Sequence, residues 1–373
     1  MTAALLSFDY GRLLGDFHTD AVYQHPYEVT VDASIVGPYM ASFIDATPLW
    51  SSDRFAQALR LPGRPVAPHL LLNLGLSFSV HDVSQQAIAH LAYVRVSFPK
   101  PLAIGGTVRA ASRVIGARAA SSGDRGVVHV HTVLVDEEGH RVLDFERKAL
   151  IRKGELLARP SLAVEAMGSA RAAEWMGHLP PKQFADVLVD RPIDRNAFAP
   201  QLWGWFDDFE PGQRLLHTAG RTVGESEHMQ LAAICRNTHP LHWDEIYCQD
   251  KSFKKARVVY GGLVLAWTLT QASLDVGGHV LWEVGWSDGA HPNPVLAGDT
   301  IYAATEVLEK QAVNDRVGVV SLRMVGVKNR RPADLLAAGV DLFSPEQGKP
   351  AETRVAEKVV EIRRDMLVRR KPA

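Results

Sequence analysis

The part of this 373-residue chain best suited to chemistry is the stretch Asn237-Thr238-His239-Pro240-Leu241-His242, with Asp244 close behind. Imidazole is well suited to proton transfer at neutral pH, because its unperturbed pKa is about 6.5. A carboxylate can exchange protons, whereas an amide can only donate and accept hydrogen bonds. The stretch is therefore a candidate for proton-transfer chemistry.

A second feature is Gly261-Gly262, which opens the long apolar segment Leu263 to Val276. Backbone N–H groups at the start of a helix are free and favour negative charge, and glycine lets a ligand approach them closely. The alternative is a pair of packing glycines. A basic run precedes this turn and either meets phosphate groups by charge attraction or is a solvated loop. It consists of Lys251, Lys254, Lys255 and Arg257.

Composition narrows the class of protein. Hydrophobic residues make up 46 % of the chain, enough for a sizeable core, and the formal net charge of −1 argues against a dedicated nucleic-acid binder. Cys235 and Cys248 are too few for a disulfide framework and lack zinc-site spacing. No signal peptide and no apolar stretch of ~20 residues is evident. We expect a soluble cytoplasmic protein with no metal, no other cofactor, no nucleic-acid partner and no membrane partner.

An internal repeat organises the chain. At an offset of 192 residues Pro48 and Leu49 align with Pro240 and Leu241, while Asp45 aligns with Asn237 and Trp50 with His242. At an offset of 193, Pro68 aligns with Gly261, and Gly105-x-Thr107 aligns with Gly298-x-Thr300. A register held over some 80 residues predicts a duplicated unit rather than two unrelated α+β domains.

The sequence pattern of each half predicts the same arrangement: a strand, a short helix, a Pro-Leu loop, a long buried helix and then several strands. A long helix wrapped by an antiparallel sheet is an α+β fold. We expect an N-terminal unit over residues 1–155, a partly helical connector over 156–200 and a C-terminal unit over 201–373. An inserted loop is expected from Arg330 to Pro350, before a last strand near Val355 to Val368.

The pattern resembles the MaoC-like (R)-specific enoyl-CoA hydratases of the hotdog superfamily, whose loop reads Asp-x-Asn-Pro-Leu-His-x-Asp before a glycine turn. The matching residues here are Asn237, Pro240, Leu241, His242 and Asp244, then Tyr260-Gly261-Gly262-Leu263. Within that family the layout is most similar to the mesaconyl-CoA hydratases, also called β-methylmalyl-CoA dehydratases. The resemblance implies a double hotdog fold and a hydro-lyase that adds water to an acyl-CoA thioester, with mesaconyl-CoA as the expected substrate.

The resemblance also assigns roles. His242 is the implied proton-transfer residue and Gly261 the implied oxyanion donor; the alternatives are a turn-capping His and a packing glycine. Trp50 cannot transfer protons usefully and Pro68 has no N–H, so only the second half is expected to be catalytic. The family's usual Asp is Asn237 here. Either Asn237 orients the water for His242, or another acid/base group assists, or the activity is altered; the candidates are Asp45, His239, Asp244 and Glu245.

Substrate-binding residues are also predicted. Arg236 is a candidate for a second acyl carboxylate, although such an arginine is more often a solvated helix end. The other binding candidates are Lys254, Lys255, Arg257 and Gly262. Competing functions are a general (R)-specific enoyl-CoA hydratase, a hotdog acyl-CoA thioesterase and a non-catalytic acyl-CoA-binding protein. We expect a homodimer or higher homo-oligomer.

Overall fold

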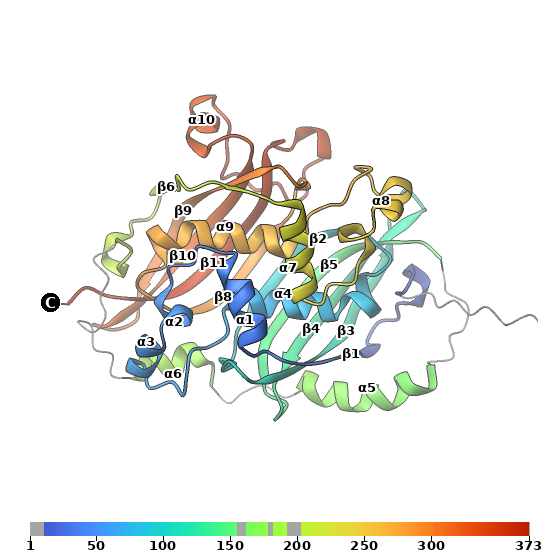
Figure 1. Ribbon diagram of the computed structural model, residues 1–373, viewed down its shortest axis with the longest axis horizontal. Coiled ribbons are helices and arrows are strands. Elements are labelled where there is room, and N and C mark those ends of the chain that lie inside the picture. Colours follow the sequence, from blue (N-terminus) through green and yellow to red (C-terminus); the bar gives the residue numbers. More distant parts are fainter. Residues whose placement is uncertain (1–10, 155–161, 178–181, 192–202, 373) are drawn as a thin grey trace, which may run out of the picture.

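The computed structural model describes residues 11–154, 162–177, 182–191 and 203–372, and through them runs one antiparallel sheet of 11 strands (Figure 1). Its order is β1-β3-β4-β5-β2-β8-β11-β10-β9-β6, with β7 paired to β9. The first half supplies β1 to β5 and the second half supplies the rest. The two halves therefore join edge to edge where β2 pairs with β8, with Tyr93 opposite Gly289 and Ser97 opposite Gly285.

The elements repeat between the halves. Those of the first half and the connector are β1 (Val22–Thr30), α1 (Ala33–Ala41), α2 (Pro48–Ser51), α3 (Asp53–Ala58), α4 (Pro68–Phe78), β2 (Ala87–Ser97), β3 (Thr107–Ala119), β4 (Arg125–Val135), β5 (Arg141–Arg152), α5 (Leu162–Gly177) and α6 (Phe184–Asp190). Those of the second half are β6 (Arg214–Leu216), β7 (Arg221–Thr222), α7 (Glu225–Ile234), α8 (Glu245–Lys251), α9 (Gly261–Val276), β8 (Val280–Ala290), β9 (Thr300–Ala312), β10 (Val317–Lys328), α10 (Pro332–Ala337) and β11 (Lys358–Arg369).

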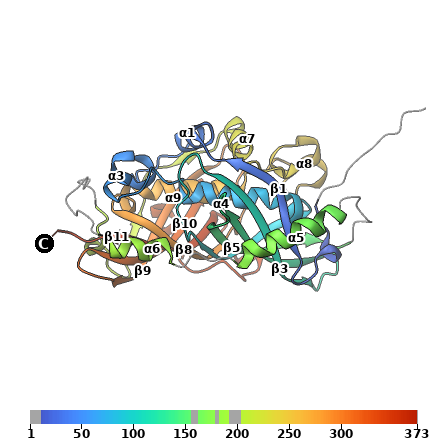
Figure 2. The same cartoon turned by 90° about the horizontal axis from the view of Figure 1, so that it is seen from below.

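The long helices α4 and α9 lie on one face of the sheet, contact each other and are covered in turn by α1, α7 and α8 (Figure 2). Both are buried nearly all round because their sequences are apolar on every side. Helix α5 packs on the opposite face, where Trp175 meets Ala111 and Val133. Helix α10 does the same for the second half through Leu335. This layering sets the two Pro-Leu loops beside the starts of α4 and α9.

The predicted α+β double hotdog fold is confirmed. The apolar segment from Leu70 to Val83 is α4 followed by a π-helix over Val80–Ser84, and the inserted loop after Arg330 contains α10. The predicted boundaries at residues 155 and 200 lie outside the described residues, so that division stays a prediction. None of the described helices is long and apolar enough to cross a membrane.

Gly262 tests the packing of the two long helices. A Cβ atom there would lie 1.8 Å from Oδ1 of Asn73, and the buried Asn73 amide already donates to the Gly262 carbonyl at 3.2 Å. We expect Gly262→Ala to lower the free energy of unfolding by about 1–3 kcal/mol through overpacking. Gly37→Ala on exposed α1 is the control, since nothing lies within 4 Å of its Cβ position. Urea unfolding that shows equal stability for both variants would contradict this packing role.

Candidate active site

The loop between α7 and α8 is held by hydrogen bonds of its own residues. Helix α7 ends through Arg236, whose φ of +62° turns the chain toward the buried Asn237. Oδ1 of Asn237 accepts from the backbone N–H of His239 at 3.0 Å, which forms an Asx turn. The indole of Trp243 donates to the Asn237 carbonyl at 2.7 Å and closes the loop. The loop is therefore a fixed platform for His242.

His242 has a defined tautomer. Its Nδ1 lies 2.7 Å from the carbonyl oxygen of Val258, and because a carbonyl can only accept, Nδ1 carries the proton in the neutral ring. Nε2 then holds a lone pair. The Leu241 carbonyl accepts from the Val258 N–H at 3.0 Å, so the same segment fixes both the loop and the ring. This arrangement presents Nε2 of His242 as a proton acceptor.

Burial decides the charge of this imidazole. Loss of solvent lowers the pKa of His242 from 6.5 to about 4; the Val258 carbonyl opposes the change and positive charge on His228 adds to it. The neutral, basic form is therefore present at neutral pH. Once protonated, the same ring is a stronger acid than free imidazole and returns its proton readily.

His239 holds the loop rather than offering a free nitrogen. Its Nδ1 accepts from the N–H of Leu241 at 3.1 Å, and its Nε2 lies 3.3 Å from the carbonyl of Ala87, a residue of the first half. Burial lowers the pKa of His239 to about 3, so the ring is neutral. With both nitrogens engaged by backbone, the structure does not support the prediction that His239 is an additional acid or base.

Gly261 begins α9, where a backbone N–H has no acceptor within the helix. The ring of the preceding residue, Tyr260, has its centroid 5.4 Å from that of the His242 ring. A Cβ on Gly261 would be 3.2 Å from Nε2 of His291, so a side chain at this position would require the His291 ring to shift. Gly261 therefore has the free backbone donor that the predicted oxyanion role requires.

His291 is a neighbour that sequence reasoning missed. It follows β8, and its Nε2 lies 3.3 Å from the hydroxyl of Tyr93 on β2, while Nδ1 lies 3.3 Å from the carbonyl of Val359. Burial lowers its pKa to about 4. Its repeat position in the first half is Phe98, so no repeated pattern marked it. Only the pairing of β2 with β8 brings His291 and Tyr93 together.

Several predicted residues lie elsewhere. Asp244 is the N-cap of α8, accepting from Tyr247 N–H at 2.9 Å, so it is a capping residue rather than an acid or base. Glu245 pairs with Arg257, which also pairs with Glu225. Gly262 packs against Asn73 instead of lining a ligand surface. Arg236, Lys254 and Lys255 are exposed, so their predicted roles toward the substrate gain no support from the geometry.

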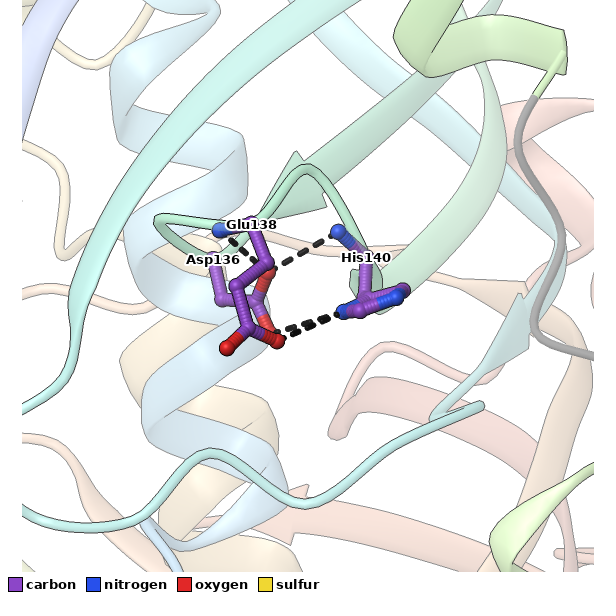
Figure 3. Close-up of side chains that lie close together, drawn as sticks. All are labelled: Asp136, Glu138 and His140. Carbon is purple, nitrogen blue, oxygen red and sulfur yellow. Dashed lines mark hydrogen bonds and ion pairs between the residues drawn. The ribbon is translucent and has the colours of Figure 1, made fainter.

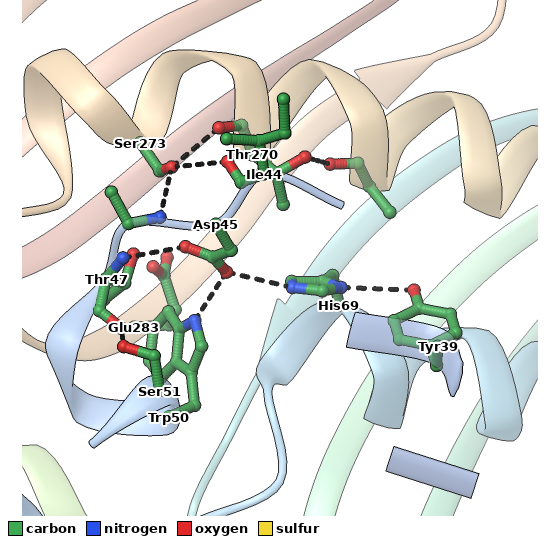
Figure 4. Close-up of polar contacts among 12 residues, drawn as sticks. Tyr39, Ile44, Asp45, Thr47, Trp50, Ser51, His69, Thr270, Ser273 and Glu283 are labelled. Carbon is green, nitrogen blue, oxygen red and sulfur yellow. Dashed lines mark hydrogen bonds and ion pairs between the residues drawn. The ribbon is translucent and has the colours of Figure 1, made fainter. Parts of the chain in front are cut away.

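The first-half copy of the loop departs as predicted at two positions: buried Trp50 replaces His242, and Pro68 begins α4. Asp45 nevertheless has a histidine partner, which comes from outside its own loop. Oδ2 of Asp45 accepts from Trp50 Nε1 at 2.6 Å and lies 3.2 Å from His69 Nε2, and the other ring nitrogen of His69 meets Tyr39 (Figure 4). His69 comes from the start of α4, which no loop motif covers.

Both carboxylate oxygens of Asp45 are engaged in contacts of this kind. Its second oxygen accepts from the Thr47 N–H at 2.9 Å, the counterpart of the Asx turn at Asn237. Burial alone would raise the pKa of the Asp45 carboxyl, but the hydrogen bond and charge attraction of His69 hold it below its usual value. Asp45 and Trp50 line a cavity of about 280 Å³. Since all these bonds lie in the first half, Asp45 does not reach His242.

Comparison with known proteins places this arrangement in a family. The sequence profile of the mesaconyl-CoA hydratases matches residues 7–334. A relative from Cereibacter sphaeroides named mesaconyl-CoA hydratase is 34 % identical over 322 residues, 86 % of this chain and 90 % of that protein. A relative from Chloroflexus aurantiacus named beta-methylmalyl-CoA dehydratase is 31 % identical over 331 residues, 86 % of this chain and 89 % of that protein. The chain belongs to the mesaconyl-CoA hydratase family.

Solved structures agree with this membership. A MaoC domain protein from Chloroflexus aurantiacus superposes with a TM-score of 0.76 at 26 % identity, covering 97 % of this chain and 98 % of that one. A protein from Mycobacterium tuberculosis with a double hotdog fold shares the architecture at a TM-score of 0.69 and 20 % identity, over 96 % and 98 % of the two chains. As a family member the protein is a hydro-lyase, the enzyme class predicted from the sequence.

One cluster of acidic and histidine side chains has the composition of a metal site, but a lysine side chain lies among them. Asp136, Glu138 and His140 gather at the turn between β4 and β5 (Figure 3). The Lys100 ammonium lies 2.6 Å from Asp136, 3.5 Å from Glu138 and 3.2 Å from Nδ1 of His140. A lysine at the centre of these groups supplies the positive charge that a cation would bring. The cluster is best explained as a turn-stabilising network.

The protonation of His242 is directly measurable. We expect its ring to titrate with a pKa of about 4 in the folded protein and to show the Nδ1–H tautomer in nitrogen NMR spectra. Because the unfolded chain binds this proton at about 6.5, folding stability should fall as pH drops from about 6.5 toward 4. His242→Gln should weaken that slope. A folded-state pKa at or above the unfolded value would contradict the burial argument.

Proposed function

We propose that this protein reversibly hydrates mesaconyl-CoA to β-methylmalyl-CoA, with His242 as the proton-transfer residue and the Gly261 N–H as the oxyanion donor. Both directions are named among its relatives, one a hydratase and the other a dehydratase. The observation that carries the proposal is the hydrogen bond from His242 Nδ1 to the Val258 carbonyl. It leaves Nε2 basic and ties the ring to Val258, three residues before the start of α9, where enolate charge can be stabilised.

A single imidazole can carry out both proton transfers of the reaction. Water adds its oxygen to the β-carbon and gives a proton to Nε2 of His242, while the thioester oxygen becomes an enolate that accepts from the Gly261 N–H. The imidazolium then gives that proton to the α-carbon, and no proton is gained or lost overall. A ring whose pKa is about 4 is a strong enough acid, once charged, to drive the second transfer.

Asn237 supports this cycle without exchanging protons. Its Oδ1 is engaged in the Asx turn, whereas its amide nitrogen donates to no acceptor among the described residues. That N–H is suited to hold the oxygen of the attacking water. The absence of a carboxylate also leaves the pKa of His242 under the control of burial. We further propose that the enzyme acts in the cytoplasm and as a homodimer or larger assembly, for which light scattering is the test.

A substrate screen tests the proposed function. Purified protein is mixed with mesaconyl-CoA, crotonyl-CoA and a longer enoyl-CoA, and loss of the enoyl absorbance is followed together with product mass. We expect mesaconyl-CoA to gain the mass of water without thiol release. Better turnover of crotonyl-CoA would replace the dicarboxylic substrate by a general one. Thiol release from a saturated acyl-CoA would point to a thioesterase, and binding without turnover to a non-catalytic protein.

Replacement of His242 tests the proposed base. We expect His242→Gln to lower kcat/KM by about 10²- to 10⁴-fold, the usual contribution of a general acid–base residue. Asp244→Asn is the matched control on the same loop, because asparagine is an equally good helix N-cap. Its kcat/KM should stay within about threefold of wild type if Asp244 only caps α8. Comparable losses in both variants would mean that loop folding, not proton transfer, was disturbed.

Replacement of Asn237 tests the missing carboxylate. In Asn237→Asp the carboxylate keeps an acceptor for the His239 N–H and brings negative charge to the loop that carries His242. A nearby negative charge favours the charged imidazole, so the pKa of His242 should rise from about 4 toward neutrality. The acid limb of the kcat/KM profile should therefore move to higher pH than in wild type. An unmoved acid limb would show that His242 does not control it.

A further inference from the structure

Arg147 on β5 is a buried cation with no carboxylate counter-ion among the described residues. The residue is 4 % exposed, and its Nη2 donates to the hydroxyls of Ser79 and Ser84 at 2.9 and 3.2 Å. Its Nε finds no hydrogen-bond partner among the described residues, and no described carboxylate lies within ion-pair distance. Burial lowers the pKa of Arg147 from 12.5 to about 10, which leaves it charged. A buried, charged group with an unused donor needs an explanation.

The repeat supplies an internal comparison. Strands β5 and β11 have 12 residues each, β2 and β8 have 11 each, and end-to-end alignment pairs Arg147 with Arg364, Tyr93 with Trp286 and His90 with Glu283. The sheet register agrees: Arg147 stands opposite Tyr93, and Arg364 stands opposite Trp286. The two arginines therefore occupy equivalent places in the two halves.

Their counter-ions differ. Nε of the buried Arg364 lies 2.9 and 3.1 Å from the two carboxylate oxygens of Glu283, which also accepts from Trp286 Nε1 at 2.7 Å. The equivalent of Glu283 beside Arg147 is His90, and neither of its ring nitrogens has a hydrogen-bond partner among the described residues. Burial, then the charges of His291 and Arg147, keep the pKa of His90 well below 6.5. A neutral ring has replaced the carboxylate.

Two routes connect Arg147 to the proposed catalytic residues. Along the sheet, its cross-strand neighbour Tyr93 meets His291 through the hydroxyl at 3.3 Å, and His291 lies against Gly261. Along α4, its partner Ser79 is two residues from Ser77, whose hydroxyl donates to the Tyr260 hydroxyl at 3.4 Å. The Tyr260 ring in turn faces His242. The cation is therefore linked to the surroundings of the proposed base and oxyanion donor through these intervening residues.

The surroundings of the first-half loop show what a carboxylate does at the equivalent place. Glu283 is drawn beside Trp50, the counterpart of His242, and α2 with Trp50 packs on β8 with Glu283 (Figure 4). There the protein supplies its own carboxylate to Arg364 next to the degenerate loop. Beside the His242 loop that carboxylate is missing, while the arginine is kept.

We propose that Arg147 binds the free carboxylate of a dicarboxylic acyl-CoA, in the place equivalent to that of Glu283 beside Arg364 in the second half. The inference rests on the proposed function and assigns its substrate selectivity to a residue of the first half rather than to the exposed Arg236. Ser79 and Ser84 hold the guanidinium, and its unused Nε–H remains for the ligand. A carboxylate so bound fixes the orientation of the double bond between His242 and Gly261.

A matched substrate pair tests the subsite. Tigloyl-CoA differs from mesaconyl-CoA only in having a methyl group where the free carboxylate stands. We expect Arg147→Met to lower kcat/KM for mesaconyl-CoA by about 10²-fold or more, with less than about a threefold change for tigloyl-CoA. The control removes the buried pair of the other half together, by Glu283→Gln with Arg364→Met, and should leave the ratio of the two kcat/KM values unchanged.

A second variant keeps Arg147 in place. His90→Glu copies the Glu283 pair of the same protein, so the fold is expected to accept it, and the new carboxylate should occupy Arg147. We expect the selectivity for mesaconyl-CoA over tigloyl-CoA to fall by about 10-fold or more, as in Arg147→Met. An equal loss for both substrates, or no loss in either variant, would overturn the subsite.

A binding measurement separates this inference from the proposed reaction. Methylsuccinyl-CoA and 2-methylbutyryl-CoA are saturated counterparts of the two substrates and cannot be hydrated. We expect wild type to bind methylsuccinyl-CoA more tightly by calorimetry and Arg147→Met to lose that preference. Retained preference in wild type without any hydration would remove the proposed reaction and keep the subsite. Active hydration without a carboxylate preference would do the reverse.

Discussion

The junction between the two halves is the constraint on which the rest of the structure depends. Strand β2 pairs with β8, and α4 packs on α9 so closely that Gly262 and Asn73 leave no room for a Cβ. This junction brings the Tyr93 hydroxyl to Nε2 of His291 and the Ser77 hydroxyl to the Tyr260 hydroxyl. A loop of the second half thus obtains its surroundings from the first half. Neither half alone would bury His242 or place Arg147 near it.

Burial is also the physical basis of the chemistry we propose. In water an imidazole is a moderate base and a weak acid, whereas the enclosed ring of His242 is neutral and becomes a stronger acid once protonated. The hydrogen bond to Val258 selects the tautomer that such a cycle requires. A carboxylate at position 237 would counteract burial by stabilising the charged ring, and Asn237 does not. The amide is therefore consistent with a single histidine that carries the proton from water to carbon.

Duplication and divergence explain the unequal halves. The first half kept the loop geometry, including the Asx turn at Asp45, but turned its polar groups inward toward His69 and Trp50. In the second half, Arg364 pairs with the carboxylate of Glu283 on the neighbouring strand. In the first half, the equivalent Arg147 is kept, but His90 stands where the carboxylate would be. The surroundings of Arg147 are therefore suited to bind a charged acyl group, whereas Arg364 is already paired within the protein.

The sequence by itself determined the repeat, the α+β class and the loop with His242, because these depend on local patterns and on residue spacing. The double hotdog fold and the hydro-lyase class were implied by the resemblance of that loop to the MaoC-like hydratases. Helix α9 is predictable from its apolar run, and the loss of an N–H at Pro68 from the residue type alone. Three features required the tertiary structure: the His69 partner of Asp45, the place of His291 beside Gly261, and the unpaired Arg147. In the sequence Arg147 stands between Glu146 and Lys148 and has the pattern of a solvated charge run. Its side chain points inward because strand alternation places it between buried Phe145 and Ala149. Only the packing of α4 over that face and the pairing of β5 with β2 determine which groups surround it.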